Sequence, residues 1–252
     1  MHSMPRHFTI VIPSYNNELW VDKCLSSALQ QDYDNYEVVY INDCSTDKTL
    51  EHAQNIFEQN VIPEGSKVIS NEINKKALRN LSYNISSSRE DTIIIALDGD
   101  DWLPNNKVLK TLDEVYSSGD VWMTAGSYID NVAGRISQPN IDPSYWDGNI
   151  RMKPWTISHL RTFRRELFMK IKHEDLLDDD EDFYKFTFDQ AMMYPMAEMS
   201  GPDHFQEIKE VMYVYNRRNP ISVDRVHRQE QLRIERKIRL MQPYKRIGSL
   251  YE

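Results

Sequence analysis

Strand-like and helix-like segments alternate along the first half of the chain, and this alternation constrains the fold most strongly. Short apolar or β-branched runs predict strands at 8–12, 36–41, 67–70, 92–97 and 121–128. Segments with helical periodicity lie between them, at 18–30, 45–59, 74–86 and 105–116. The pattern predicts an α/β fold with a mostly parallel central sheet flanked by helices. The run 92–97 (TIIIAL) is typical of a central strand buried on both faces.

The second half is less regular. Residues 130–157 carry Pro, Asn, Asp, Gly and Trp without clear periodicity, which predicts a long loop region. Residues 174–182 hold seven acids in nine positions and predict a solvated loop. Further elements are expected as helices at 164–171 and 188–199, a strand at 211–216 and a basic helix at 223–241.

Composition excludes several classes of protein. The formal net charge of −9 argues against nucleic acid as a partner, because such binding needs a basic surface. The chain has no apolar run long enough for a membrane span and no secretory signal at its start, so any membrane contact is expected to be peripheral. Two cysteines do not make a disulfide framework, and a cytoplasmic location is expected. The eight glycines form no dinucleotide-binding or P-loop motif.

Polar residues follow three of the predicted strands, at 13–16 (PSYN), 42–45 (NDCS) and 98–101 (DGDD). Ligands of an open parallel sheet bind beyond the carboxyl ends of its strands. The carboxylates of 98–101 repel one another unless a cation joins them, and hard divalent cations such as Mn²⁺ or Mg²⁺ take oxygen ligands. Gly99 would let the backbone approach a ligand closely. An acidic turn that caps a helix is the alternative, and the match with the other two strand ends favours a metal.

These residues resemble the motifs of family 2 glycosyltransferases, which have the GT-A fold. The resemblance rests on IPSYNN (12–17), INDCSTD (41–47), ALRN (77–80) and LDGDDWL (97–103). It is strongest over about 8–130 and extends more loosely through 158–168, 188–201 and 213–220. It implies a single GT-A domain over 1–252, with a nucleotide-sugar-binding half at about 8–130, an acceptor-binding half at about 131–222 and a C-terminal basic helix at about 223–241.

The resemblance also implies a nucleotide site. The residues matching Pro13, Ser14 and Tyr15 line the base in that family, with the aromatic ring packing against it. The acid matching Asp43 accepts a hydrogen bond from the imide of the base. Arg79 matches a position near the nucleotide and could pair with it.

The residues matching Asp98 and Asp100 form the DxD pair of the family. The resemblance implies that Asp100 is the direct ligand of Mn²⁺ or Mg²⁺, and that Asp98 contacts the ribose or shares the metal. Asn42 departs from the family pattern, which often has a second acid there, and Cys44 stands where glycine is common. The acid that the base needs, Asp43, is present.

Inverting glycosyl transfer needs a general base to take a proton from the acceptor hydroxyl. Family members use an acid at the start of a helix after the DxD half, and Asp189 in FDQAM matches it best. Asp182 and Asp180 are the alternatives. A helix N-cap is the competing interpretation of Asp189.

Acceptor-binding residues are harder to select. Trp146 and Trp155 lie in the predicted loop region and are candidates because aromatic faces suit the apolar faces of sugars. Asp101 is a further candidate. His159 and His204 could be metal ligands or phosphate contacts, although a lone histidine is more often structural.

The sequence therefore predicts a metal-dependent inverting glycosyltransferase with a nucleotide-sugar donor. A UDP-sugar is preferred because the imide of uracil fits Asp43, and a dTDP-sugar offers the same imide. The acceptor is expected to be a hydroxyl of a glycan, a protein or a lipid-linked molecule. One alternative is a sugar-phosphate nucleotidyltransferase, which should carry an N-terminal Gly-rich loop where this chain has VIPSYNN. A non-catalytic nucleotide-sugar-binding module is the other.

Overall fold

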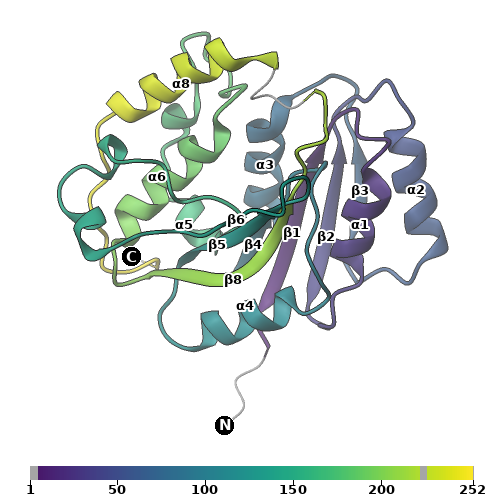
Figure 1. The fold of residues 1–252 in the computed structure, drawn as a ribbon, viewed down its shortest axis with the longest axis horizontal. Helices are drawn as coiled ribbons and strands as arrows, with labels where there is room; N and C mark the ends of the chain where they lie inside the picture. The colour runs from purple at the N-terminus through teal and green to yellow at the C-terminus, as the bar shows by residue number, and fades with distance from the viewer. Residues whose placement is uncertain (1–4, 222–225, 252) are drawn as a thin grey trace.

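A computed structural model describes residues 5–221 and 226–251 of the chain. An eight-stranded sheet forms its centre, with the order β3-β2-β1-β4-β7-β5-β6 and with β8 paired to β5 (Figure 1). The strands are β1 (His7–Ser14), β2 (Tyr36–Asn42), β3 (Lys67–Ser70), β4 (Thr92–Ala96), β5 (Met123–Asp130), β6 (Ile136–Ser137), β7 (Arg161–Arg164) and β8 (Phe205–Tyr215). The predicted α/β class with a mostly parallel sheet is confirmed.

One reversed strand lies in the middle of this sheet. β7 runs antiparallel to β4 on one side and to β5 on the other, so β4 and β5 themselves point the same way. The helix expected at 164–171 is shorter in the structure: α5 covers only Arg165–Phe168, and Arg164 is the last residue of β7. Three of the four residues of β7 are arginine or threonine, so the strand has no apolar run that would reveal it.

Helices cover both faces of the sheet (Figure 1). On one face, a core cluster joins the sheet to α1 (Val21–Leu29), α2 (Thr49–Gln59) and α4 (Val108–Ser117). On the other, a second cluster joins it to α3 (Lys76–Ser87), α5 (Arg165–Phe168), α6 (Phe188–Ser200) and α8 (Arg228–Leu240). The predicted strand 92–97 is β4, which is buried along its whole length and contributes to both clusters, as a central strand must.

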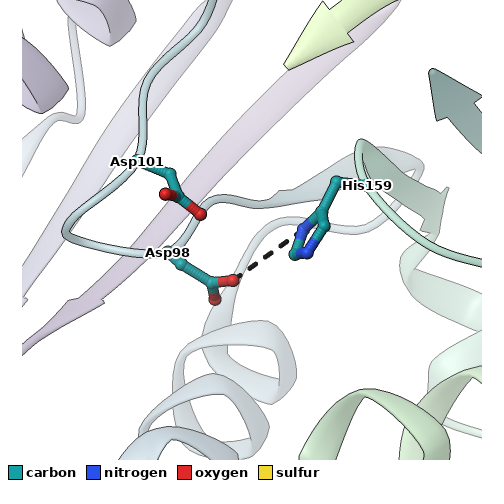
Figure 2. A group of neighbouring side chains, drawn as sticks. All are labelled: Asp98, Asp101 and His159. Atoms are coloured by element: carbon teal, nitrogen blue, oxygen red, sulfur yellow. Dashed lines mark ion pairs between the residues drawn. The ribbon is translucent and has the colours of Figure 1, made fainter. Parts of the chain in front are cut away.

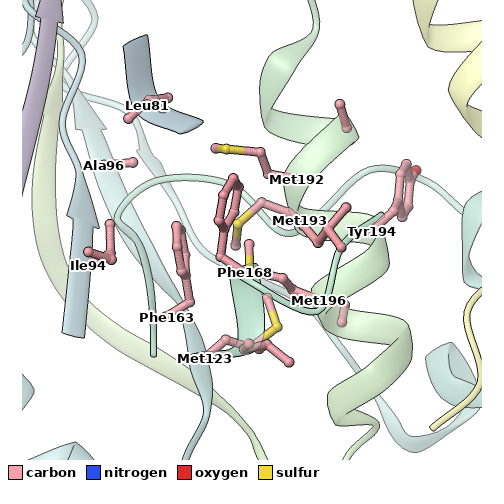
Figure 3. Packing of buried hydrophobic residues seen from close by; sticks show 14 of the residues in the cluster. Leu81, Ile94, Ala96, Met123, Phe163, Phe168, Met192, Met193, Tyr194 and Met196 are labelled. Carbon is pink, nitrogen blue, oxygen red and sulfur yellow. The ribbon is translucent and has the colours of Figure 1, made fainter. Parts of the chain in front are cut away.

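The helix α6 is held in place by its burial. Methionines 192, 193 and 196 pack towards Phe163 of β7 and Phe168 of α5 (Figure 3). Nearly the whole helix from Gln190 to Ser200 is buried, and it continues through Pro195. Because a packed helix fixes the direction of its first turn, α6 gives the residues near its start a defined position.

The second half holds more regular structure than the sequence predicted. The segment 130–157 includes β6 and two short 3₁₀ helices, η1 (Pro143–Trp146) and η2 (Ile150–Met152). The strand expected at 211–216 begins at Phe205. The basic helix expected at 223–241 appears as α8, while residues 222–225 lie outside the described residues. Of the helices that the structure describes, none is long and apolar enough to cross a lipid bilayer.

The acidic segment 178–182 is paired with this basic helix. Asp178 contacts Arg233, and Lys237 Nζ lies 2.9 Å from Asp178 Oδ1. Burial by itself would raise the pKa of Asp178, but the hydrogen bonds from Arg233 and Lys237 hold that pKa far below its ordinary value. A short 3₁₀ helix, η3 (His173–Leu176), precedes the segment. The segment is therefore tied to α8 by ion pairs.

The Asp178→Asn variant is expected to lower the free energy of unfolding at pH 7 by about 1 kcal/mol. Because the folded-state pKa is depressed, this stabilisation is complete above the ordinary aspartate pKa of about 3.9 and declines as the pH falls below it. Urea denaturation of both proteins at pH 7 and pH 3 measures the difference. The Asp203→Asn variant is the control, because Asp203 is exposed and forms no ion pair among the described residues. An equal difference for Asp178→Asn at both pH values would contradict the pairing.

Candidate active site

The carboxyl ends of β1, β2 and β4 meet at one cavity of about 590 Å³. β1 is paired with β2 up to Ser14 and Asn42, and with β4 up to Val11 and Ala96, so the loops that follow these strands lie side by side. The predicted site residues that line the cavity are Pro13, Ser14, Tyr15, Asp43, Asp98, Asp100, Asp101 and Asp189.

Gly99 allows two of these loops to approach each other. A Cβ atom at this position would lie 2.5 Å from the Cβ of Ser14 and 2.8 Å from the carbonyl oxygen of Pro13. Gly99 was expected to approach a ligand closely, whereas its close neighbour in the structure is the end of β1. Any larger residue would push the acidic loop away from β1.

Asp43 organises the end of the cavity that lies at β2. Its carboxylate accepts hydrogen bonds from Asn71 Nδ2 at 2.9 Å and from the backbone N–H groups of Lys75 and Lys76 at 2.8 Å each. The residue is 3% exposed. A carboxylate offers about four acceptor positions, so these three bonds leave room for one more donor. The same bonds fix the turn that leads into α3.

The three acids of the DGDD motif have different surroundings. Asp98 Oδ2 accepts a hydrogen bond from Arg161 Nη2 at 3.2 Å and lies 3.2 Å from Tyr213 Oη. Asp100 Oδ2 accepts one at 2.8 Å from Asn219 Nδ2, on the loop after β8. Asp98 and Asp100 therefore bound the cavity from the β4 end.

Asp101 is the buried member of the motif, only 1% exposed. Tyr213 Oη donates a hydrogen bond to it at 2.5 Å and the Asn216 N–H donates another at 2.7 Å. Burial raises the pKa of Asp101 well above its ordinary value, and the charges of Asp100 and Asp98 raise it further. These contacts tie the acidic loop to β8 and the loop that follows it.

Asp98, Asp101 and His159 form a group that could hold a metal ion (Figure 2). Their candidate ligand atoms lie within 4.8 Å of one another, and Asp98 Oδ2 is 3.8 Å from His159 Nδ1. Arg161 already places positive charge here, because its Nη2 lies 2.7 Å from His159 Nδ1 and also donates to Asp98. Burial, and then this guanidinium, lower the pKa of His159 well below its ordinary value. A positive charge, the Arg161 guanidinium, therefore already lies beside this group.

The carboxylate oxygens at the cavity nevertheless suit a hard divalent ion as ligands. Asp98 Oδ1 accepts no hydrogen bond within the part of the chain that the structure describes, and Asp100, on the same loop, also lines the cavity. Carboxylate oxygens are ligands that Mn²⁺ and Mg²⁺ accept.

Asp189 lines the cavity from the first turn of α6. Burial raises the pKa of Asp189, while the Arg161 guanidinium lowers it. The two alternative acids lie elsewhere. Asp182 Oδ1 is 2.7 Å from Arg79 Nη2, and Asp180 Oδ2 is 2.8 Å from Lys185 Nζ.

Three predicted site residues do not line the cavity. Arg79 is paired with Asp182. Trp146 packs against Phe205, with ring centroids 5.2 Å apart, and Trp155 packs against Tyr194 at 5.0 Å. Both tryptophans lie along the edge of the core cluster rather than at the cavity.

Only one of the two histidine candidates lies at the cavity. His159 lies at the cavity, and its ring stacks on Tyr213 with centroids 4.4 Å apart. His204 instead stacks on Trp122 at 3.7 Å, away from the cavity lining.

Sequence reasoning missed Arg161 and Asn219, which both line the cavity. Arg161 is the first residue of the reversed strand, so it lies at the same sheet edge as the ends of the parallel strands. Asn219 lies in YVYNRRNP, the stretch that carried the looser resemblance, and this was the only available signal for it.

Comparisons with known proteins identify the family of the chain. A sequence profile described as Glycosyl transferase family 2 matches residues 9–176. The chain belongs to this family. An uncharacterized glycosyltransferase of Haemophilus influenzae is 31% identical over 120 residues, which cover 48% of this chain and 46% of the relative. A poly(ribitol-phosphate) β-N-acetylglucosaminyltransferase, TarS of Staphylococcus aureus, is 29% identical over 41% of this chain and 18% of its own length. The chain thus spans less than half of these curated relatives.

Solved structures share the fold at low identity. TarS 1–349 of S. aureus in complex with UDP-GlcNAc has a TM-score of 0.65 at 19% identity, covering 92% of this chain and 65% of that one. A mannosyltransferase of Pyrobaculum calidifontis in complex with GDP-Man and Mn²⁺ has a TM-score of 0.63 at 16% identity, covering 96% and 67%. The expected GT-A fold is confirmed.

Proposed function

We propose that this chain is a metal-dependent inverting glycosyltransferase that moves a sugar from a nucleotide-sugar donor to an acceptor hydroxyl. One observation carries the proposal: acids from the ends of β2 and β4 and from the start of α6 line the same cavity. In a family-2 fold, a cavity lined by these acids can hold the diphosphate of the donor at one end and its nucleotide base at the other. Structural neighbours solved with UDP-GlcNAc or with GDP-Man and Mn²⁺ support this class of donor.

The base of the nucleotide is assigned to the end of the cavity with Pro13, Tyr15 and Asp43. The remaining acceptor position of Asp43 suits the imide N–H of uracil, so a UDP-sugar is the preferred donor. Ser14 completes this wall at the end of β1. Arg79 could contact the nucleotide only if its ion pair with Asp182 broke.

Asp98 and Asp100 would hold Mn²⁺ or Mg²⁺, with Asp100 as the direct ligand. Such an ion neutralises the charge that develops on the leaving diphosphate. Asn219 and Arg161 keep the two carboxylates oriented, because each donates a hydrogen bond to one of them.

Asp189 is assigned as the general base. It takes the proton of the acceptor hydroxyl as the acceptor oxygen forms a bond to the anomeric carbon of the sugar. The bond between that carbon and the phosphate oxygen breaks, and the nucleoside diphosphate leaves with the electron pair. Attack from the face opposite the leaving group inverts the configuration.

A panel of UDP-, dTDP- and GDP-sugars tests the proposal. Thermal shift with Mn²⁺ identifies the donor, and release of the nucleoside diphosphate then reports transfer or slow donor hydrolysis. Turnover that depends on Mn²⁺ or Mg²⁺ supports the proposal. Release of pyrophosphate from a nucleoside triphosphate would indicate a nucleotidyltransferase, and metal-dependent binding without turnover would indicate a binding module.

The Tyr15→Ala variant is expected to weaken UDP binding by about 1–3 kcal/mol if the ring stacks on the base, on the scale of base–aromatic stacking. Tyr15 lines the cavity and is 41% exposed, so a base can reach its ring. Calorimetric titration with UDP measures the change. The Tyr83→Ala variant is the control, because Tyr83 is 65% exposed on α3 and does not line the cavity. Equal UDP affinity of the Tyr15→Ala variant and the wild type would rule out stacking.

A further inference from the structure

One part of the cavity lining lacks the acids that dominate the rest. Except for Asp189, every described acid that lines the cavity comes from the ends of β2 and β4. Residues 185–188 and 226–231 contribute a second group of lining residues: Lys185, Phe186, Thr187, Phe188, Val226, His227 and Gln231. The charge of Lys185 is already paired, because its Nζ lies 2.8 Å from Asp180 Oδ2. These surroundings suit an uncharged ligand rather than a diphosphate with its metal ion.

Two aromatic rings form a stacked pair in this second group. The ring centroids of Phe186 and His227 lie 4.7 Å apart, with 26° between the ring planes. Phe186 is half-buried and His227 is exposed. Such a pair offers an apolar surface on which the apolar face of a sugar ring can pack. Trp146 and Trp155 were expected in this role, but their rings pack against the core cluster instead.

Hydrogen-bonding groups lie beside the rings. The Gln231 backbone N–H donates to the His227 carbonyl at 2.9 Å, so the two residues lie one helical turn apart on the same side of α8. Among the described residues, neither Gln231 Nε2 nor the ring nitrogens of His227 have a hydrogen-bond partner. An apolar ring surface bordered by polar groups matches a sugar, which presents C–H groups on its faces and hydroxyls at its edge.

The same segment of chain carries the proposed base. Thr187 Oγ1 donates to the Gln231 carbonyl oxygen at 3.1 Å, which ties this segment to α8. Asp189 follows Phe186 by three positions and lines the same cavity. Three residues span at most about 11 Å, a distance that a short saccharide covers. A sugar on the ring pair can therefore bring one of its hydroxyls to Asp189.

We propose that Phe186, His227 and Gln231 form the acceptor subsite of the transfer reaction, and that the acceptor is a saccharide, either free or carried on another molecule. The sugar stacks on the ring pair and accepts a hydrogen bond from the Gln231 amide. This rests on the proposed function, because it takes Asp189 as the base. An alkyl chain would leave the amide without a partner, and peptide and lipid acceptors are the alternatives that the test distinguishes.

Saturation-transfer NMR with the methyl glycosides of glucose, galactose, mannose and N-acetylglucosamine tests the subsite without turnover. UDP and Mg²⁺ are present to fill the donor end. At least one glycoside should bind the wild type, and the Phe186→Leu variant should raise its Kd about tenfold, because leucine is apolar but has no ring face. Gln231→Ala should raise the Kd several-fold, since the carbonyl that holds Thr187 belongs to the backbone.

Phe57→Leu is the matched control, because Phe57 is a half-buried phenylalanine of α2 that does not line the cavity. Calorimetric titration with UDP shows that each variant keeps its donor site. A wild type that binds a glycoside through Phe186 but transfers no sugar refutes the proposed function and supports the subsite. Failure of all the glycosides to bind, or equal binding by Phe186→Leu and the wild type, overturns the inference. Transfer to a peptide or to an alkyl alcohol at a rate that Phe186→Leu leaves unchanged also overturns it.

Discussion

The Asp189→Asn variant is expected to bind the nucleotide-sugar donor as the wild type does and to lose about 10²–10⁴-fold in kcat. Asparagine keeps the size and the polar contacts of the side chain but cannot take the proton of an acceptor hydroxyl. Asp189 lines the cavity while both alternative acids are held in ion pairs outside its lining, so no other candidate replaces it. The rate of UDP release from the donor measures kcat, even with water as the acceptor.

The control for this experiment is the Asp182→Asn variant, which removes the ion pair with Arg79 and should keep most of the activity. Titration with UDP and Mn²⁺ confirms that the donor site of the Asp189→Asn variant is intact. Retained kcat in Asp189→Asn would assign the base to another residue. A fall in kcat as large in Asp182→Asn would show that the acidic segment itself takes part in catalysis.

The Asp100→Asn variant is expected to lose the dependence of UDP binding on Mn²⁺, with the fold intact. A neutral amide is a poor ligand in place of the direct carboxylate ligand, and without the ion the diphosphate would face the negative charges of Asp98 and Asp189. Asn219 would also lose its charged hydrogen-bond partner. Calorimetric titration with UDP, with and without Mn²⁺, gives the two affinities whose ratio should fall to about one.

Asp120→Asn is the matched control, because Asp120 is an exposed acid whose side chain is 69% accessible and which does not line the cavity. Its metal dependence should equal that of the wild type. If Asp100→Asn keeps the Mn²⁺ dependence, the ion is held by other groups, and Asp98 with Asp101 and His159 becomes the leading set.

The first half of the fold could be predicted well from the sequence because its signals are local. The apolar run of β4 and the alternation around β1 and β2 identify the sheet, and the carboxyl-edge rule then brings Tyr15, Asp43 and Asp98 together without any knowledge of the loops. Asp189 was found through the resemblance, since a carboxylate at a helix start has an ordinary structural role as well.

The remainder depends on contacts that a linear pattern does not encode. Arg161 reaches the cavity only because β7 is reversed, and RTFR carries no strand periodicity. Trp146 and Trp155 lie in a stretch with loop-like composition, but Trp146 is part of η1 and packs against Phe205, and Trp155 packs against Tyr194. Arg79 matched a family motif, and its partner Asp182 lies about a hundred positions further along the chain.

A crystal structure of the protein with Mn²⁺ and UDP tests the central claim most directly, since the anomalous signal of manganese marks the ion independently of the protein. We expect a manganese peak beside Asp98 and Asp100, and uracil at the end of the cavity lined by Tyr15 and Asp43. A peak centred on Asp101 and His159, or UDP bound away from this cavity, would contradict it.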